Sequence, residues 1–244
     1  MAIGFANLGV SANPDINSST DASSYVNTSW TPPTAGLIIC FVVSRTGACG
    51  NVPTVSGNSL TWVQIATICV GATAARRITL FGADAAGATT GATTIDFAAE
   101  TQQSCTASFF QATAIDLSGG VAAAFVQTAT NSGTATSGSV TLAAAGHADN
   151  RPIAMFTHRA NQATVPDAAW TEVDDLAGSA PIRGSETQWD ADGFQNASAS
   201  WVTSSDWVGM AAELKATVAA TDPALLHYNL SNQFGQRQVV PVPM

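Results

Sequence analysis

The run Leu-Ile-Ile-Cys-Phe-Val-Val at residues 37–43, between Gly36 and Arg45, decides the fold class. It is too short for a typical buried helix, and it lacks the alternation of apolar and polar residues that marks a strand with one solvent-exposed face. An uninterrupted apolar run of this kind is typical of a strand that is buried on both faces. The sequence therefore predicts a central strand here, with other parts of the chain packed on both sides of it.

Strand signals continue along the chain, separated by clusters of Gly, Pro, Asn and Ser, as expected of a sandwich or barrel. No window of about eleven residues or more has a helical period. The sequence therefore predicts an all-β protein. The other expected strands are residues 2–9, 22–30, 60–68, 77–83, 93–97, 109–117, the stretch around Val140 and Leu142, residues 152–157, short strands around Trp170, Trp189 and Trp201, and residues 207–214.

The character of the chain changes after Leu214, which divides it into a β domain at 1–215 and a C-terminal linker and arm at 216–244. Two interpretations of the arm remain open. It is either a frayed terminus, which is common, or a segment that docks on a neighbouring subunit. Docking is expected to use the large apolar side chains, which are costly to leave in water. These partner-binding candidates are Leu225, Leu226, Tyr228 and Phe234.

The charge and composition of the chain exclude several classes of function. The formal net charge is −9, which argues against nucleic acid or an anionic membrane as a partner, because both attract basic surfaces. Only 10% of residues are charged, so few titratable groups are available for catalysis. The first residues have neither a basic leader nor a long apolar core, and no run approaches the ~18 apolar residues of a membrane helix. We expect a soluble protein that is made in a cytoplasm.

The four cysteines have no C-x-x-C spacing, and the histidines lie far from them in sequence, so a zinc site is not expected. Cys40 falls inside the apolar run, where a thiol acts as a small hydrophobic group. Cys49 and Cys69 fall in or near loops and can pair in an oxidising environment. We expect free thiols.

Two patterns in the sequence are candidates for chemical sites. Asp190-Ala191-Asp192-Gly193, with Asp174 and Asp175 upstream, offers oxygen ligands for calcium, but the third ligand and closing Glu of an EF-hand are absent, and solvated turn residues are the favoured interpretation. A serine hydrolase needs a histidine with a carboxylate, and His147, His158 and His227 are the candidates. No Gly-x-Ser-x-Gly motif presents a nucleophile to them. We expect no catalytic residue, metal or cofactor.

The chain has six tryptophans, which can form a platform for sugar rings. Tryptophan is also a major component of sandwich cores and interfaces. Core or subunit contacts are therefore the favoured interpretation, with carbohydrate binding as the alternative.

Five segments, in order, resemble a jelly-roll-like β-sandwich family of phage virion structural proteins, which also occurs as modules of bacterial surface proteins. They are Ala35–Val43, Val55–Trp62, Ile78–Ala83, Ile115–Gly119 and Asp206–Leu214. The resemblance covers roughly residues 20–215, and the tail does not match it. It implies a two-sheet antiparallel sandwich without enzymatic activity.

From these observations the sequence predicts a non-enzymatic virion protein, made in the host cytoplasm, that decorates or cements a capsid. Its expected partners are the major capsid protein or other virion proteins and further copies of itself, with a trimer as one candidate form. The alternative is a carbohydrate- or receptor-binding module of a fibre or adhesin, and an enzyme is the third choice.

Overall fold

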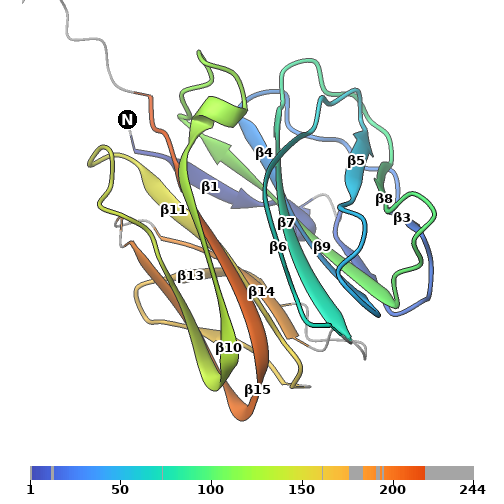
Figure 1. Ribbon diagram of the computed structural model, residues 1–244. Coiled ribbons are helices and arrows are strands. Elements are labelled where there is room, and N and C mark those ends of the chain that lie inside the picture. Colours follow the sequence, from blue (N-terminus) through green and yellow to red (C-terminus); the bar gives the residue numbers. More distant parts are fainter. Residues whose placement is uncertain are drawn as a thin grey trace, which may run out of the picture.

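The computed structural model describes residues 2–11, 14–72, 74–160, 162–175, 184–190, 193 and 195–217, and it confirms an all-β sandwich (Figure 1). All strand pairs in these residues are antiparallel, and they form two six-stranded sheets and one three-stranded sheet. The three sheets stack face to face, with one six-stranded sheet in the middle. A folded-over ribbon covers the outer face of the other six-stranded sheet. None of the described helices is long and apolar enough to cross a membrane.

The central sheet has the strand order β1–β9–β4–β7–β6, with β2 also paired to β9. Its strands are β1 (Gly4–Asn7), β2 (Ile16–Ser18), β4 (Leu37–Thr46), β6 (Val63–Val70), β7 (Ala75–Asp84) and β9 (Ser104–Thr113). Residues 37–43 of β4 are at most 1% exposed. The predicted burial of this run on both faces is therefore confirmed, because the central sheet is covered on both sides.

The large outer sheet has the order β10–β15–β11–β14–β13, with β12 paired to β15. Its strands are β10 (Phe125–Thr141), β11 (Arg151–His158), β12 (Val165–Pro166), β13 (Thr171–Asp175), β14 (Gly184–Trp189) and β15 (Asn196–Leu214). One face packs on the central sheet: Phe41 and Phe110 of the central sheet share a core with Met155 and Met210 of the outer one. This core holds the two six-stranded sheets together.

The small outer sheet covers the opposite face of the central sheet and consists of β3 (Ser24–Val26), β8 (Thr93–Asp96) and β5 (Thr54–Gly57). A second apolar cluster fills the space between them, with Cys40 and Phe109 from the central sheet and Tyr25 and Ile95 from the small one. The described helices are short: α1 (Leu8–Ser11) and a 3₁₀ turn, η1 (Ala122–Ala124).

The two longest strands, β10 and β15, pair with each other and fold back together (Figure 1). Asn131 of β10 is the strand partner of Gly209, yet Val140, nine residues further along β10, lies over the same glycine. A Cβ at Gly209 would be 2.8 Å from Val140 Cγ2 and 2.7 Å from Phe156 Cε1. The ends of the two strands therefore form a ribbon over the outer face of their own sheet.

A third apolar cluster fills the space under this ribbon and includes Trp170, Trp201 and Trp207. The reversal coincides with a register shift between Ala135 and Ser137 of β10. Gly138 lies flat against the Trp207 ring, since a Cβ there would be 2.6 Å from its Cε3 atom. The sequence predicts two separate strands in this C-terminal part, around Trp201 and at 207–214, and the structure joins them into β15.

Candidate functional site

The expected partner-binding residues Leu225, Leu226, Tyr228 and Phe234 lie outside the described residues. The structure does show how the last described residues, 215–217, are held. The Lys215 and Thr217 amides donate to the carbonyls of Ala124 and Ala114, each at 2.8 Å. The Ala216 amide donates to Asn150 Oδ1 at 3.0 Å. The described chain thus remains part of the sandwich through Thr217, which lies beside Ala114 at the end of β9.

A buried carboxylate helps to hold these last described residues. Glu213 is 0% exposed and accepts hydrogen bonds from the Gly146 amide at 2.8 Å and from Asn150 Nδ2 at 2.6 Å, and it also contacts Gln127 Nε2. The same Asn150 side chain receives the Ala216 amide. Strand β15, the loop before β11 and Ala216 are therefore held in one network.

Strand β10 presents a surface of hydroxyl groups. Strand β10 contains no Asp, Glu, Lys, Arg, His or Pro in its 17 residues. Exposed side chains along it include Thr128, Thr130, Ser132 and Thr134. The most exposed large apolar side chain in the described part of the chain is Val202 at 85%, beside the bend of the ribbon.

A groove of about 510 Å³ runs between this ribbon and the segment 165–168. Its walls carry the hydroxyls of residues 137, 139, 198 and 200, and the carboxylate of Asp167 accepts a hydrogen bond from Ser198 Oγ at 2.9 Å. Trp207 forms part of the lining but is only 6% exposed. The groove therefore offers polar hydrogen-bonding groups, with little aromatic surface for stacking.

The tryptophans are mostly structural, as the favoured interpretation predicted. Trp30, Trp170, Trp201 and Trp207 are each at most 6% exposed. The indole N–H groups of Trp30, Trp170 and Trp201 donate to Thr93 Oγ1, Asn196 O and Ala135 O at 3.0–3.1 Å. Burial with a satisfied N–H is the usual state of a core tryptophan.

The two described histidines have different surroundings, and His227 lies outside the described residues. His158 is fully buried, stacks on Trp201 with ring centroids 4.4 Å apart, and shares a hydrogen bond of 2.9 Å with Thr164 Oγ1. Burial, with a smaller effect from Arg76, lowers the pKa of His158 to about 4. It is therefore neutral at physiological pH. His147 Nδ1 lies 3.9 Å from the carboxylate of Asp149, but both are in an exposed turn where Nδ1 accepts the Asp149 amide.

The residues proposed as calcium ligands do not form one site in the described part of the chain. Asp190 Oδ1 accepts the Gly193 amide at 2.9 Å, as in a turn, and Asp192 lies outside the described residues. The carboxyl group of Asp174 instead pairs with that of Asp15, which lies near the N-terminus. The described residues contain no group of three or more His, Cys, Asp or Glu arranged to hold a metal ion.

The pairing of Asp15 and Asp174 connects the N-terminal segment to edge strand β13 of the large outer sheet. Asp15 Oδ1 accepts the Phe109 amide at 2.9 Å. Burial, with added repulsion from Asp174, raises the pKa of Asp15 to about 7, and burial also raises the pKa of Asp174. Burial raises the pKa of the neighbouring Asp175 to about 6. Two carboxyls this close favour sharing a proton.

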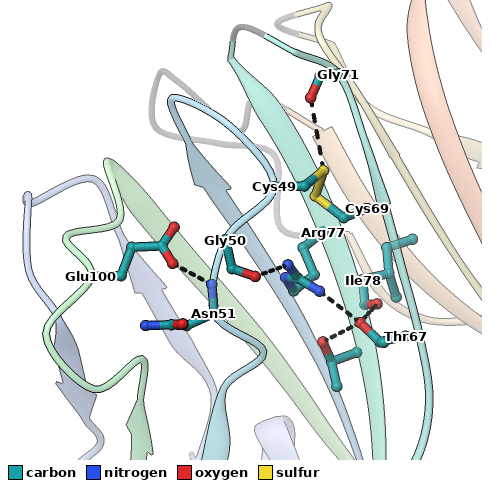
Figure 2. The surroundings of a disulfide bond; sticks show 10 residues. Cys49, Gly50, Asn51, Thr67, Cys69, Gly71, Arg77, Ile78 and Glu100 are labelled. Carbon is teal, nitrogen blue, oxygen red and sulfur yellow. Dashed lines mark hydrogen bonds between the residues drawn. A yellow bond between two sulfur atoms is a disulfide. The ribbon is translucent and has the colours of Figure 1, made fainter.

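A disulfide joins Cys49 and Cys69, so the expectation of free thiols at these positions is wrong (Figure 2). Their Cα atoms are 5.8 Å apart, although twenty residues separate them in sequence. Cys40 and Cys105 are free and buried, and burial raises the pKa of both thiols. The pairing of Cys49 with Cys69 could not be decided from the sequence, because the antiparallel course of β4, β7 and β6 sets the distance between them.

Arg77 reinforces the loop that carries Cys49 (Figure 2). Its guanidinium donates to Gly50 O at 2.6 Å and to Thr67 Oγ1 at 3.2 Å. On the other side of the loop, the Asn51 amide donates to the carboxylate of Glu100. The disulfide and the arginine attach residues 49–51 to the central sheet, and the glutamate attaches them to the loop between β8 and β9.

Comparison of the chain with protein-family models, with curated proteins and with solved structures finds no match. The groove, the acidic pair and the ribbon were all missed at the level of sequence. Only the ribbon left a signal there, as a long Thr- and Ser-rich stretch without charge.

Proposed function

We propose that the protein is a non-enzymatic structural component of a phage virion, namely a capsid decoration or cement protein that bridges coat subunits. Bridging requires a body that does not deform when its two ends are held. The observation that carries this proposal is the triple stack, in which the central sheet is buried on both faces by separate apolar cores. Densely packed interiors of this type have low compressibility and transmit strain.

The disulfide supports the same function. Reducing conditions in a cytoplasm keep most thiols in the reduced form, whereas a released particle persists in an oxidising environment, where disulfides are stable. The Cys49–Cys69 bond therefore fits a protein that works outside the cell in which it is made. Bridging by many copies also multiplies a weak contact by avidity, so no single copy needs a large interface.

The proposal includes a C-terminal arm. Residues 218–244, if extended, reach on the order of 90 Å, which is far beyond the sandwich. In this proposal Leu225, Leu226, Tyr228 and Phe234 contact the neighbouring virion subunit, and the network around Glu213 and Asn150 provides the rigid anchor.

Purified particles from the source of the chain test this proposal. Mass spectrometry should find the protein at a fixed copy number relative to the coat subunit. A chain ending at Thr217 should fold, judged by its circular dichroism and thermal transition, but should be lost from particles during gradient purification. Absence of the full-length protein from particles would contradict the virion role, and full occupancy by the shortened chain would contradict the arm.

A second function is supported by the groove beside Asp167. Hydroxyls and a carboxylate in a shallow groove are suited to the hydroxyl groups of a sugar, as in a carbohydrate-binding module. A glycan array tests it, with Asp167→Ala as the variant that removes the carboxylate and Asp149→Ala as an exposed control. Saturable binding by the wild type and the control, lost in Asp167→Ala, would favour this function over the cement role.

A further inference from the structure

The longest edge strand in the described part of the molecule is β10. It is the terminal strand of the large outer sheet and is hydrogen-bonded to β15, on one side only, among the described strands. The strand at the opposite edge, β13, has five residues, of which Glu172, Asp174 and Asp175 are acidic. The edge strand β6 of the central sheet has eight residues and is crosslinked through Cys69.

The middle of β10 has the regularity that strand addition requires. Register shifts occur at Phe125/Gln127 and at Ala135/Ser137, and between them residues 127–135 pair in unbroken step with residues 213–205 of β15. This leaves nine residues of continuous, regular edge. Bulges, charges and prolines are the devices by which proteins normally block such an edge, and this segment has none of them.

Charge indicates which partner can approach. The chain has a net charge of −9, so two copies repel each other over most orientations. Residues 127–135 carry no charge, and their exposed side chains are mainly hydroxyls and amides. Hydroxyl pairs across an antiparallel ladder are favourable, whereas like charges directly opposite are not. The segment is thus the long edge at which copies of this acidic chain can meet without a like-charge pair.

We infer that residues 127–135 of β10 pair antiparallel with the same residues of a second copy, across a two-fold axis at Asn131. The two large outer sheets then form one continuous sheet. In this register Thr130 lies opposite Ser132 of the second copy, and Thr128 lies opposite Thr134. The closed two-fold arrangement uses each edge once, so association stops at the dimer. The inference does not depend on the virion role, because it concerns the isolated protein.

A charge-swap experiment on the full chain tests this inference. Analytical ultracentrifugation should show the wild type at twice its 24.8 kDa monomer mass. Thr130→Arg with Ser132→Arg should raise the dimer dissociation constant at least tenfold, and Thr130→Glu with Ser132→Glu should do the same. An equimolar mixture of the two variants should restore a dimer, because opposite charges then face each other.

The matched control is Thr54→Arg with Ser56→Arg, which changes two exposed hydroxyl residues on the short edge strand β5. It should leave the dimer intact. The mixing step separates a lost interface from misfolding, since misfolded variants do not rescue each other. A monomeric wild type, a dimer that resists both charged variants, or variants that fail to recombine would each overturn the inference. Loss of the dimer in a chain ending at Thr217, with β10 intact, would assign the contact to the C-terminal segment and overturn it as well.

Discussion

Replacing Asp15 by Asn is expected to stabilise the protein at neutral and alkaline pH while having much less effect in mild acid. The buried pair of Asp15 and Asp174 is the reason, because its pKa values are raised. Asparagine keeps an oxygen for the Phe109 amide, which donates to Asp15 Oδ1 at 2.9 Å, but it carries no charge. The substitution therefore removes the ionisation and retains the hydrogen bond.

The magnitude follows from linkage. The pKa of Asp15 is about 7 in the folded protein and about 3.9 in an unfolded chain. Between these values the folded state binds more protons than the unfolded state, so the free energy of unfolding falls as pH rises. The contribution of Asp15 is complete below about pH 4 and is lost as pH rises through about 7. Between pH 5 and pH 8 this loss is on the order of 2.5 kcal/mol.

The assay is urea unfolding of both proteins at pH 5 and pH 8, followed by tryptophan fluorescence. The stability advantage of Asp15→Asn should widen by about 2.5 kcal/mol from pH 5 to pH 8, or roughly 5–10 °C in Tm for a chain of this size. Asp21→Asn, at an exposed carboxylate, removes the same formal charge and should show a constant difference. An Asp15→Asn advantage that is equal at both pH values, or larger at pH 5, would refute the raised pKa.

Three further changes test the packing. Replacing Cys49 and Cys69 by Ala should lower the free energy of unfolding by about 3 kcal/mol, because the disulfide closes a loop of about twenty residues. Reduction of the wild type should have the same effect, and urea titrations measure both. Gly209→Ala should lower the free energy of unfolding by about 1–3 kcal/mol, because the added Cβ has no room under the folded-over ribbon. Gly47→Ala, where the Cβ faces open space, should leave thermal unfolding nearly unchanged. Phe41→Ala should cost about 3–5 kcal/mol by leaving a cavity between the two large sheets, and a loss below 1 kcal/mol would contradict the burial of this ring.

Local pattern determined much of the strand content. The run at 37–43 indicated a strand buried on both faces because apolar content without alternation has few other stable solutions. Segments 77–83, 93–97 and 152–157 were also placed correctly, since their apolar residues recur with the period of a pleated strand. The first fourteen residues of β10 were missed. Their Thr, Ser and Ala side chains lie on an exposed edge, where burial imposes no apolar alternation.

Other features depended on the tertiary structure. Every residue at 207–214 is buried, because this segment lies between the central sheet and the folded-over ribbon. Cys49 meets Cys69, and Asp15 meets Asp174, only because antiparallel strands and stacked sheets bring distant segments together. The sequence by itself determined which residues avoid water and therefore which become strands. The order of the strands, the third layer and every contact between distant polar groups were decided by packing, since burial is non-directional and does not specify a partner.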